Sequence, residues 1–340
     1  MTRPPLKEVA ALAGVSEPTV SRVLNGRLGV ATATRDRVIG ALRALGFDGV
    51  PEPRSVRRNT VGIICGEFLN PVFPTFVHHI SAELGRRGYL TTVSVTDRDL
   101  APEERCLAEL SDYGVDGVVC IGGRHAELGA GLGHYRDVSD GGTPIVLVNG
   151  IATDLDVPHV RCDEGAGARK AVTHLIRLGH RDIGCVLGSS AYIPTTRLVD
   201  GYRQTIAAHD LVEPDGAITD APFTLEGGRA AATRLIERGV TAMICGNDLM
   251  ALGAVLAAIS LTGSDTDISV VGYDGTEFTA HTHPPLTTLR QPFEDMARLI
   301  SDAMISEIEG TNRFRDHFVF EPQLVAREST HPVRRSRTAV

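Results

Sequence analysis

Apolar residues recur at helical spacing in two stretches near the start of the chain, and a shorter helix fits between them. The two apolar stripes consist of Leu6, Val9, Ala10 and Ala13, and of Val38, Ala41, Leu42 and Leu45. Gly14 ends the first helix, because glycine readily adopts positive φ. Ser16 is a good N-cap for the middle helix, and Pro18 fits its first turn. The pattern predicts a helix-turn-helix unit followed by a third helix over about 32–45.

From Thr60 onward, apolar runs typical of strands alternate with amphipathic stretches typical of helices. The strand candidates are TVGIIC, YLTTVSV, GVVCIG, PIVLVNG, DIGCVLG, TAMICG and ISVVGYD. The helix candidates include 74–87, 102–113, 164–178, 197–208, 226–238 and 248–261. This alternation predicts βαβ units with parallel sheets covered on both faces, and about 280 residues suffice for two doubly wound lobes. A polar segment broken by Pro51 and Pro53 predicts a linker before this body.

The charge is distributed unevenly along the chain. Residues 1–60 carry ten Lys/Arg against five Asp/Glu, so this part is +5; because the whole chain is −8, residues 61–340 carry −13. A basic N-terminal part followed by an acidic body indicates that the N-terminal part binds nucleic acid. We expect a cytoplasmic protein, because no apolar run approaches a membrane span and the N-terminus lacks a signal peptide.

The sequence shows no residue pattern typical of a catalytic, metal-binding or dinucleotide-binding site. The six cysteines form no C-x-x-C pair, and five lie in or beside apolar runs, so we expect buried, reduced thiols. Four histidines, His78, His79, His281 and His283, have no metal-site spacing, and the GAGLG run breaks the dinucleotide pattern at His134. We therefore expect no catalytic residues, no metal and no cofactor.

Residues 6–38, LKEVAALAGVSEPTVSRVLNGRLGVATATRDRV, resemble the DNA-binding headpiece of the LacI family of bacterial transcription regulators. The body resembles the same family in FLNPVF, AVTHLIRLGHRDIG, GNDLMALGAV, ISVVGYDG and PPLTTLRQP. The resemblance implies an all-α helix-turn-helix headpiece followed by a two-lobed α/β domain like the class I periplasmic binding proteins. The expected parts are a headpiece (1–48), a hinge (49–59), an N-lobe (60–161 and 291–320), a C-lobe (162–290 and 321–330) and a tail (331–340).

A recognition helix lies in the major groove with its first residues against the base edges, which places Glu17, Pro18 and Arg22 on the readout face. Arg22 can bind guanine O6 and N7 together. Glu17 either accepts from cytosine N4 or acts as a favourable charge at the helix N-terminus. The residues placed for phosphate contacts are Thr19, Ser21, Asn25 and Thr34. Val56 occupies the position of the family's minor-groove wedge, although Pro53 leaves a plain extended linker as the alternative.

Ligands of open α/β sheets bind beyond the carboxyl ends of the strands, and seven residues are expected there. The candidates are Asn70, Phe73, Asn149, Arg197, Phe223, Asn247 and Asp274. Asp248 is interpreted instead as a helix N-cap, and Arg197 either contacts the ligand or faces solvent. Phe73 and Phe223 either stack on the ligand or belong to the core.

The sequence therefore predicts a homodimeric repressor, with a tetramer as an open alternative, that binds pseudo-palindromic double-stranded operator DNA. We expect a small-molecule effector between the lobes: a sugar first, a nucleoside or purine as the alternative. The stripe Phe76, Val77, Ile80 and Leu84 packs either on the sheet or against a second subunit. The competing hypothesis is a solute-binding protein that does not act on DNA.

Overall fold

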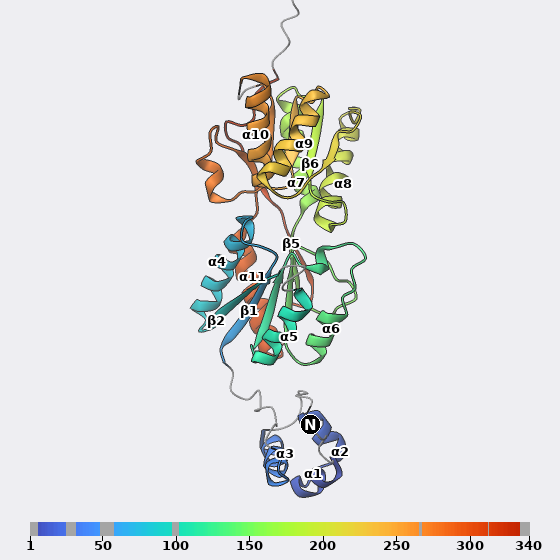
Figure 1. Cartoon of the computed structure of the whole chain (residues 1–340), viewed down its shortest axis with the longest axis vertical. Helices are drawn as coiled ribbons and strands as arrows, with labels where there is room; N and C mark the ends of the chain where they lie inside the picture. The colour runs from blue at the N-terminus through green and yellow to red at the C-terminus, as the bar shows by residue number, and fades with distance from the viewer. Residues whose placement is uncertain are drawn as a thin grey trace, which may run out of the picture.

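The computed structural model describes residues 6–24, 32–47, 58–96, 102–264, 267–311 and 313–333. Its first three helices form a unit of their own, separate from the larger body (Figure 1). They are α1 (Leu6–Ala13), α2 (Glu17–Leu24) and α3 (Thr32–Ala44). Gly14 after α1 has φ +61°, as its turn position predicts. Val9, Val20, Val38 and Leu42 bring the three helices together in one small core.

The first lobe of the body is a parallel six-stranded sheet with the strand order β11-β5-β4-β3-β1-β2. Its strands are β1 (Thr60–Cys65), β2 (Leu90–Val95), β3 (Gly117–Ile121), β4 (Ile145–Val148), β5 (His159–Cys162) and β11 (His317–Phe320). Its helices are α4 (Val72–Arg86), α5 (Glu103–Tyr113), α6 (Gly133–Asp140) and α11 (Phe293–Glu309). Helices therefore cover both faces, as the continuous apolar strands predict.

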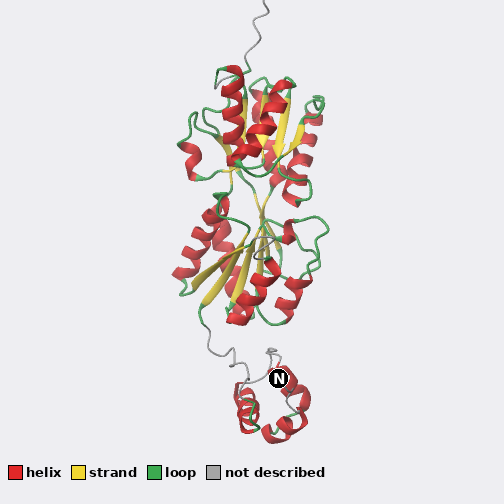
Figure 2. Ribbon diagram, viewed as in Figure 1, coloured by secondary structure: helices red, strands yellow, loops and turns green. Residues whose placement is uncertain are grey.

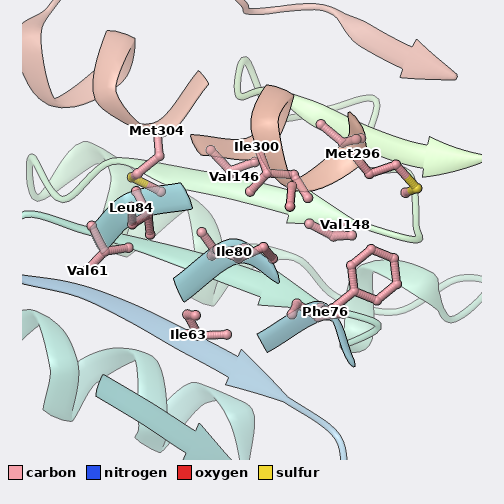
Figure 3. Packing of buried hydrophobic residues seen from close by; sticks show 14 of the residues in the cluster. Val61, Ile63, Phe76, Ile80, Leu84, Val146, Val148, Met296, Ile300 and Met304 are labelled. Atoms are coloured by element: carbon pink, nitrogen blue, oxygen red, sulfur yellow. The ribbon is translucent and has the colours of Figure 1, made fainter. Parts of the chain in front are cut away.

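Helices α4 and α11 pack side by side on one face of this sheet (Figure 3). Phe76, Ile80 and Leu84 of α4 are fully buried against Val61 and Ile63 of β1 and against residues of α11. The apolar stripe of α4 is thus used within the lobe, so the second-subunit alternative does not hold for these three side chains. Val77 is half-buried beside them.

The second lobe is a six-stranded sheet with the order β12-β10-β9-β8-β6-β7, in which only the β10–β12 pair is antiparallel. Its strands are β6 (Ile183–Leu187), β7 (Ile218–Asp220), β8 (Ala242–Cys245), β9 (Ser269–Asp274), β10 (Thr287–Arg290) and β12 (Gln323–Val325). Helices α9 (Leu225–Glu237) and α10 (Asp248–Thr262) cover one face. Helices α7 (Glu164–Arg177) and α8 (Ile193–Ala208) cover the other.

The two lobes are stacked along the long axis of the molecule and joined by three chain crossings (Figure 2). The crossings lie between β5 and α7, between β10 and α11, and between β11 and β12. Residues 331–333 still belong to the second lobe, because Val333 N–H donates to Leu178 O at 2.9 Å and His331 N–H to Ser269 Oγ at 3.0 Å. The first three residues of the predicted tail thus pack on the second lobe, and the rest of it lies outside the described residues.

The structure also contains two short 3₁₀ helices, at Arg124–Ala126 and at Glu277–Ala280. All six cysteines are buried and none forms a disulfide, as expected from their apolar surroundings. Within the ranges given above, no helix is both long and apolar enough to span a membrane.

Candidate functional site

The second helix of the N-terminal unit presents the residues predicted to touch DNA bases. Glu17 and Pro18 are exposed at its start, and Arg22 follows within the same helix. The Ser16 and Thr19 hydroxyls are 2.8 Å apart, which links the turn to the first turn of α2. Thr19, Ser21 and Thr34 are half-buried, whereas Asn25 and Val56 lie outside the described residues.

A cavity of about 930 Å³ opens between the two lobes of the body. Its wall comes from the segments that follow the strands β1 to β5 of the first lobe and β6 to β10 of the second. These segments stand at the carboxyl ends of the strands, where ligands of doubly wound sheets bind. The cavity is thus the candidate ligand site, and both lobes contribute to it.

Six of the seven predicted ligand residues line this cavity: Asn70, Phe73, Asn149, Phe223, Asn247 and Asp274. Arg197 is not among the lining residues. Its side chain is only 22% exposed, so it does not face solvent, and its NH1 lies 3.5 Å from Oε2 of Glu164, a buried residue that does line the cavity. A direct contact between Arg197 and a ligand stays a prediction.

Each lobe places one phenylalanine ring over two glycines that follow neighbouring strands. A Cβ on Gly122, after β3, would lie 3.2 Å from the Phe73 ring, and one on Gly66, after β1, would lie 3.6 Å away. Phe223 lies in the same way against Gly188 and Gly246, after β6 and β8. Both rings pack on the edge of their lobe's core and also line the cavity, so the core interpretation is confirmed, and stacking on a ligand stays a prediction.

Asp274 ends β9 in a backbone conformation with φ +104° and is 5% exposed. Its Oδ1 accepts a hydrogen bond from Gln291 Nε2 at 2.9 Å. Burial raises the pKa of Asp274 well above its usual range, and the neighbouring Asp248 carboxyl raises it further. Asp274 therefore tends to hold its proton, which lets it serve a ligand hydroxyl as donor or acceptor.

Asp248 is not the N-cap of α10, which corrects the interpretation made from the sequence. Asn247 takes that role, because its Oδ1 accepts from the backbone N–H of Met250 at 2.8 Å. Asp248 is instead buried among the hydroxyls of Thr276 and Thr288, which donate to it at 2.7 and 2.6 Å. Burial raises its pKa to about 6, while these hydrogen bonds work against the increase.

Comparison with known proteins agrees with the two kinds of site. Residues 5–49 match the model of the lacI family of bacterial regulatory proteins, and residues 172–330 match the periplasmic binding protein-like domain. The regulator reg1 of Streptomyces lividans is 40% identical over 337 residues, which cover 96% of each chain. The chain belongs to the LacI family of bacterial regulatory proteins.

Two solved structures are similar over almost the whole chain. The complex of the transcriptional regulator CelR with cellobiose has a TM-score of 0.71 and 30% identity, covering 96% of this chain and 100% of that one. A Lac repressor dimer bound to operator and an anti-inducer has a TM-score of 0.68 and 25% identity, with coverage of 97% and 100%. This LacI-family chain is thus a DNA-binding transcription regulator and not an enzyme.

The structure of this LacI-family regulator adds cavity residues that the sequence did not single out. Glu103 and Glu164 begin α5 and α7, whose starts were predicted at 102 and 164. Gln291 follows β10, a strand that the sequence pattern did not predict. Over the described ranges, no group of three or more His, Cys, Asp and Glu side chains could hold a metal ion.

Proposed function

We propose that this regulator is a repressor whose affinity for its operator is switched by a sugar bound between the lobes. One observation carries the proposal: residues from both lobes, predicted from the sequence as ligand contacts, line one cavity of about 930 Å³. A ligand that contacts both walls binds the closed and open arrangements differently, and only such a difference can shift the equilibrium between them. The CelR–cellobiose complex supports a sugar as the class of effector.

For DNA, we propose that α2 enters the major groove. Glu17, Pro18 and Arg22 then read base edges, while Thr19, Ser21, Asn25 and Thr34 contact phosphates. Val56 would wedge into the minor groove between the two halves of the site. The basic character of residues 1–60 supports this, since phosphate contacts release counterions and make the affinity fall steeply with salt.

We propose a homodimer on a pseudo-palindromic operator, because a twofold protein pairs two headpieces with two half-sites. The Lac repressor dimer on its operator supports this assembly. On this chain, Leu90, Val93 and Val95 are 73%, 38% and 40% exposed on β2, the edge strand of the first sheet. A second copy covering that edge would remove these apolar side chains from water.

The test uses the full chain and a labelled DNA fragment from upstream of its own gene. Fluorescence anisotropy is measured without and with each member of a sugar panel: glucose, ribose, maltose and cellobiose. The proposal expects tight, salt-sensitive binding that one sugar weakens at least tenfold in wild type but not in Asp274→Ala. Tight DNA binding that no sugar or nucleoside alters would contradict the effector part alone.

A further inference from the structure

Charged side chains around the cavity are almost all acidic. Among the described lining residues the glutamates are Glu67, Glu103, Glu104, Glu127 and Glu164. Arg124 is the one lysine or arginine among the same residues. Its Nε lies 3.6 Å from Glu104 Oε1 and its NH1 3.8 Å from Glu127 Oε2, so its charge is already opposed by two carboxylates. The described part of the wall therefore offers a second anion no uncompensated cation.

Helix N-termini are the other usual binding sites for phosphate. At this cavity, several helices have an acidic side chain in their first turn. Glu103 and Glu104 form the first turn of α5, and Glu164 begins α7. Glu103 Oε2 already accepts from the backbone N–H of Arg124 at 2.8 Å. The first turn of α10 is likewise occupied, because Asn247 caps it and Asp248 is its first residue. The negative charge of these carboxylates compensates the partial positive charge at the helix N-termini, which would otherwise attract an anion.

The cavity wall also contains hydrogen-bond acceptors that are buried and unused. Oδ1 of Asn149 and Oε1 of Gln291 each lack a hydrogen-bond partner. Asn149 stands in a left-handed conformation with φ +62°, and both residues line the cavity. A buried acceptor without a partner costs about 1–3 kcal/mol, which a donor on a ligand can recover. Hydroxyl groups supply such donors, and phosphate dianions do not.

We infer that the interlobe site takes an uncharged polyhydroxy compound and rejects sugars that carry a phosphate or carboxylate. This inference rests on the proposed function, because it names the class of effector for that same cavity. Phosphate groups would meet the acidic wall and offer no donor to the acceptors of Asn149 and Gln291. Neutral sugars present only hydroxyls and ring oxygens, which match acceptors and amide donors alike.

Matched pairs of ligands test the inference on the full chain. Thermal shift and calorimetric titration compare glucose with glucose 6-phosphate, ribose with ribose 5-phosphate, and cellobiose and maltose with their terminal phosphate esters. We expect every stabilising compound to be neutral and its phosphorylated counterpart to bind at least tenfold more weakly. A phosphorylated compound that binds more tightly than its parent would overturn the inference and leave the proposed function intact. If neither member of any pair stabilised or bound the protein, the result would contradict the proposed function and, with it, this inference.

A charge reversal isolates the acidic wall as the cause. Glu104→Lys replaces a lining carboxylate and leaves Arg124 opposed by Glu127 alone, whereas Glu109→Lys makes the same change on α5 at an exposed residue that pairs with Arg105 and does not line the cavity. In 20 mM salt we expect Glu104→Lys to improve the phosphate-to-neutral affinity ratio about tenfold, with a smaller gain in ~0.5 M salt, where charges are screened. Glu109→Lys should leave the ratio within about twofold. An unchanged ratio in Glu104→Lys would overturn the electrostatic argument.

Discussion

The side-chain Nε2 of Gln291 donates to Oδ1 of Asp274 at 2.9 Å. Asp274 ends β9 in the second lobe, while Gln291 stands between β10 and α11, in one of the three crossings to the first lobe. A backbone hydrogen bond also joins the two residues: Gln291 N–H donates to Asp274 O at 3.0 Å. A ligand that contacts Asp274 therefore acts on a residue bonded directly to an interlobe crossing, which connects binding to the relative position of the lobes.

Removing the amide of Gln291 should weaken this connection. In Gln291→Ala we expect sugar to lose most of its effect on DNA affinity, because Asp274 would lack its buried donor at a cost of about 1–3 kcal/mol. DNA binding without sugar should stay within about threefold of wild type. Anisotropy titrations with and without the effector measure both quantities.

Gln204→Ala provides the matched control, since Gln204 is exposed on α8, away from the cavity lining. A Gln291→Ala variant that responds to sugar as fully as Gln204→Ala would show that this hydrogen bond plays no part in coupling.

A methyl group at Gly188 should disturb the ligand site by displacing an aromatic ring. A Cβ there would overlap the ring of Phe223, which must then move into the cavity. We expect Gly188→Ala to weaken sugar binding at least tenfold and to destabilise the body by about 1–3 kcal/mol. Gly85→Ala is the control, because nothing lies within 4 Å of its Cβ and alanine favours helix α4. Calorimetric titration and urea unfolding distinguish the two effects, and equal sugar affinities in both variants would contradict the packing argument.

Stability of the first lobe should fall in acid because of His125. This ring is fully buried, with Nε2 2.9 Å from Val148 O and Nδ1 2.9 Å from Tyr135 Oη, and burial lowers its pKa to about 4. Between pH 6.5 and 4 the unfolded chain binds the proton and the folded one does not, so the His125 contribution is complete above pH 6.5 and decreases as the pH falls.

From pH 7 to pH 5 this single group should reduce the free energy of unfolding by about 2 kcal/mol. His125→Gln should lose correspondingly less over the same interval, whereas His78→Gln, at an exposed position of α4, should follow wild type. Urea unfolding at the two pH values measures the difference. Parallel pH dependence in all three proteins would show that His125 does not titrate as its burial requires.

Much of the fold could be predicted because its signals are local. The stripe around Leu42 and the turn at Gly14 determine the headpiece, and runs such as TVGIIC identify buried parallel strands. Strand β5 (HVRC) interrupts its apolar residues with polar ones, and β12 (QLV) has only three residues, so neither gives a clear apolar run. Helix α11 belongs to the first lobe although its sequence follows the second; the family resemblance implied this place, but no local pattern shows it.

In the candidate site, too, local sequence signals predict some residues, whereas only long-range packing reveals the others. Asn149 and Asp274 could be placed near the cavity because each follows a strand that is evident from its sequence. The partner of Asp248 could not, since Thr288 is forty positions away and meets it only through the pairing of β9 and β10. Arg197 was predicted as a ligand residue but does not line the cavity, and its approach to Glu164 depends on the packing of α7 against α8.

Sequence reading by the first residues of α2 is tested with Arg22→Ala. Anisotropy compares binding to the upstream promoter fragment and to a scrambled fragment of equal length and composition, with Arg37→Ala, an exposed position on α3, as control. A lost bidentate contact to guanine should reduce the preference for the promoter by about 1–3 kcal/mol, roughly 5- to 150-fold, in Arg22→Ala. Arg37→Ala should preserve that preference. A promoter preference in Arg22→Ala equal to that of wild type would contradict the account.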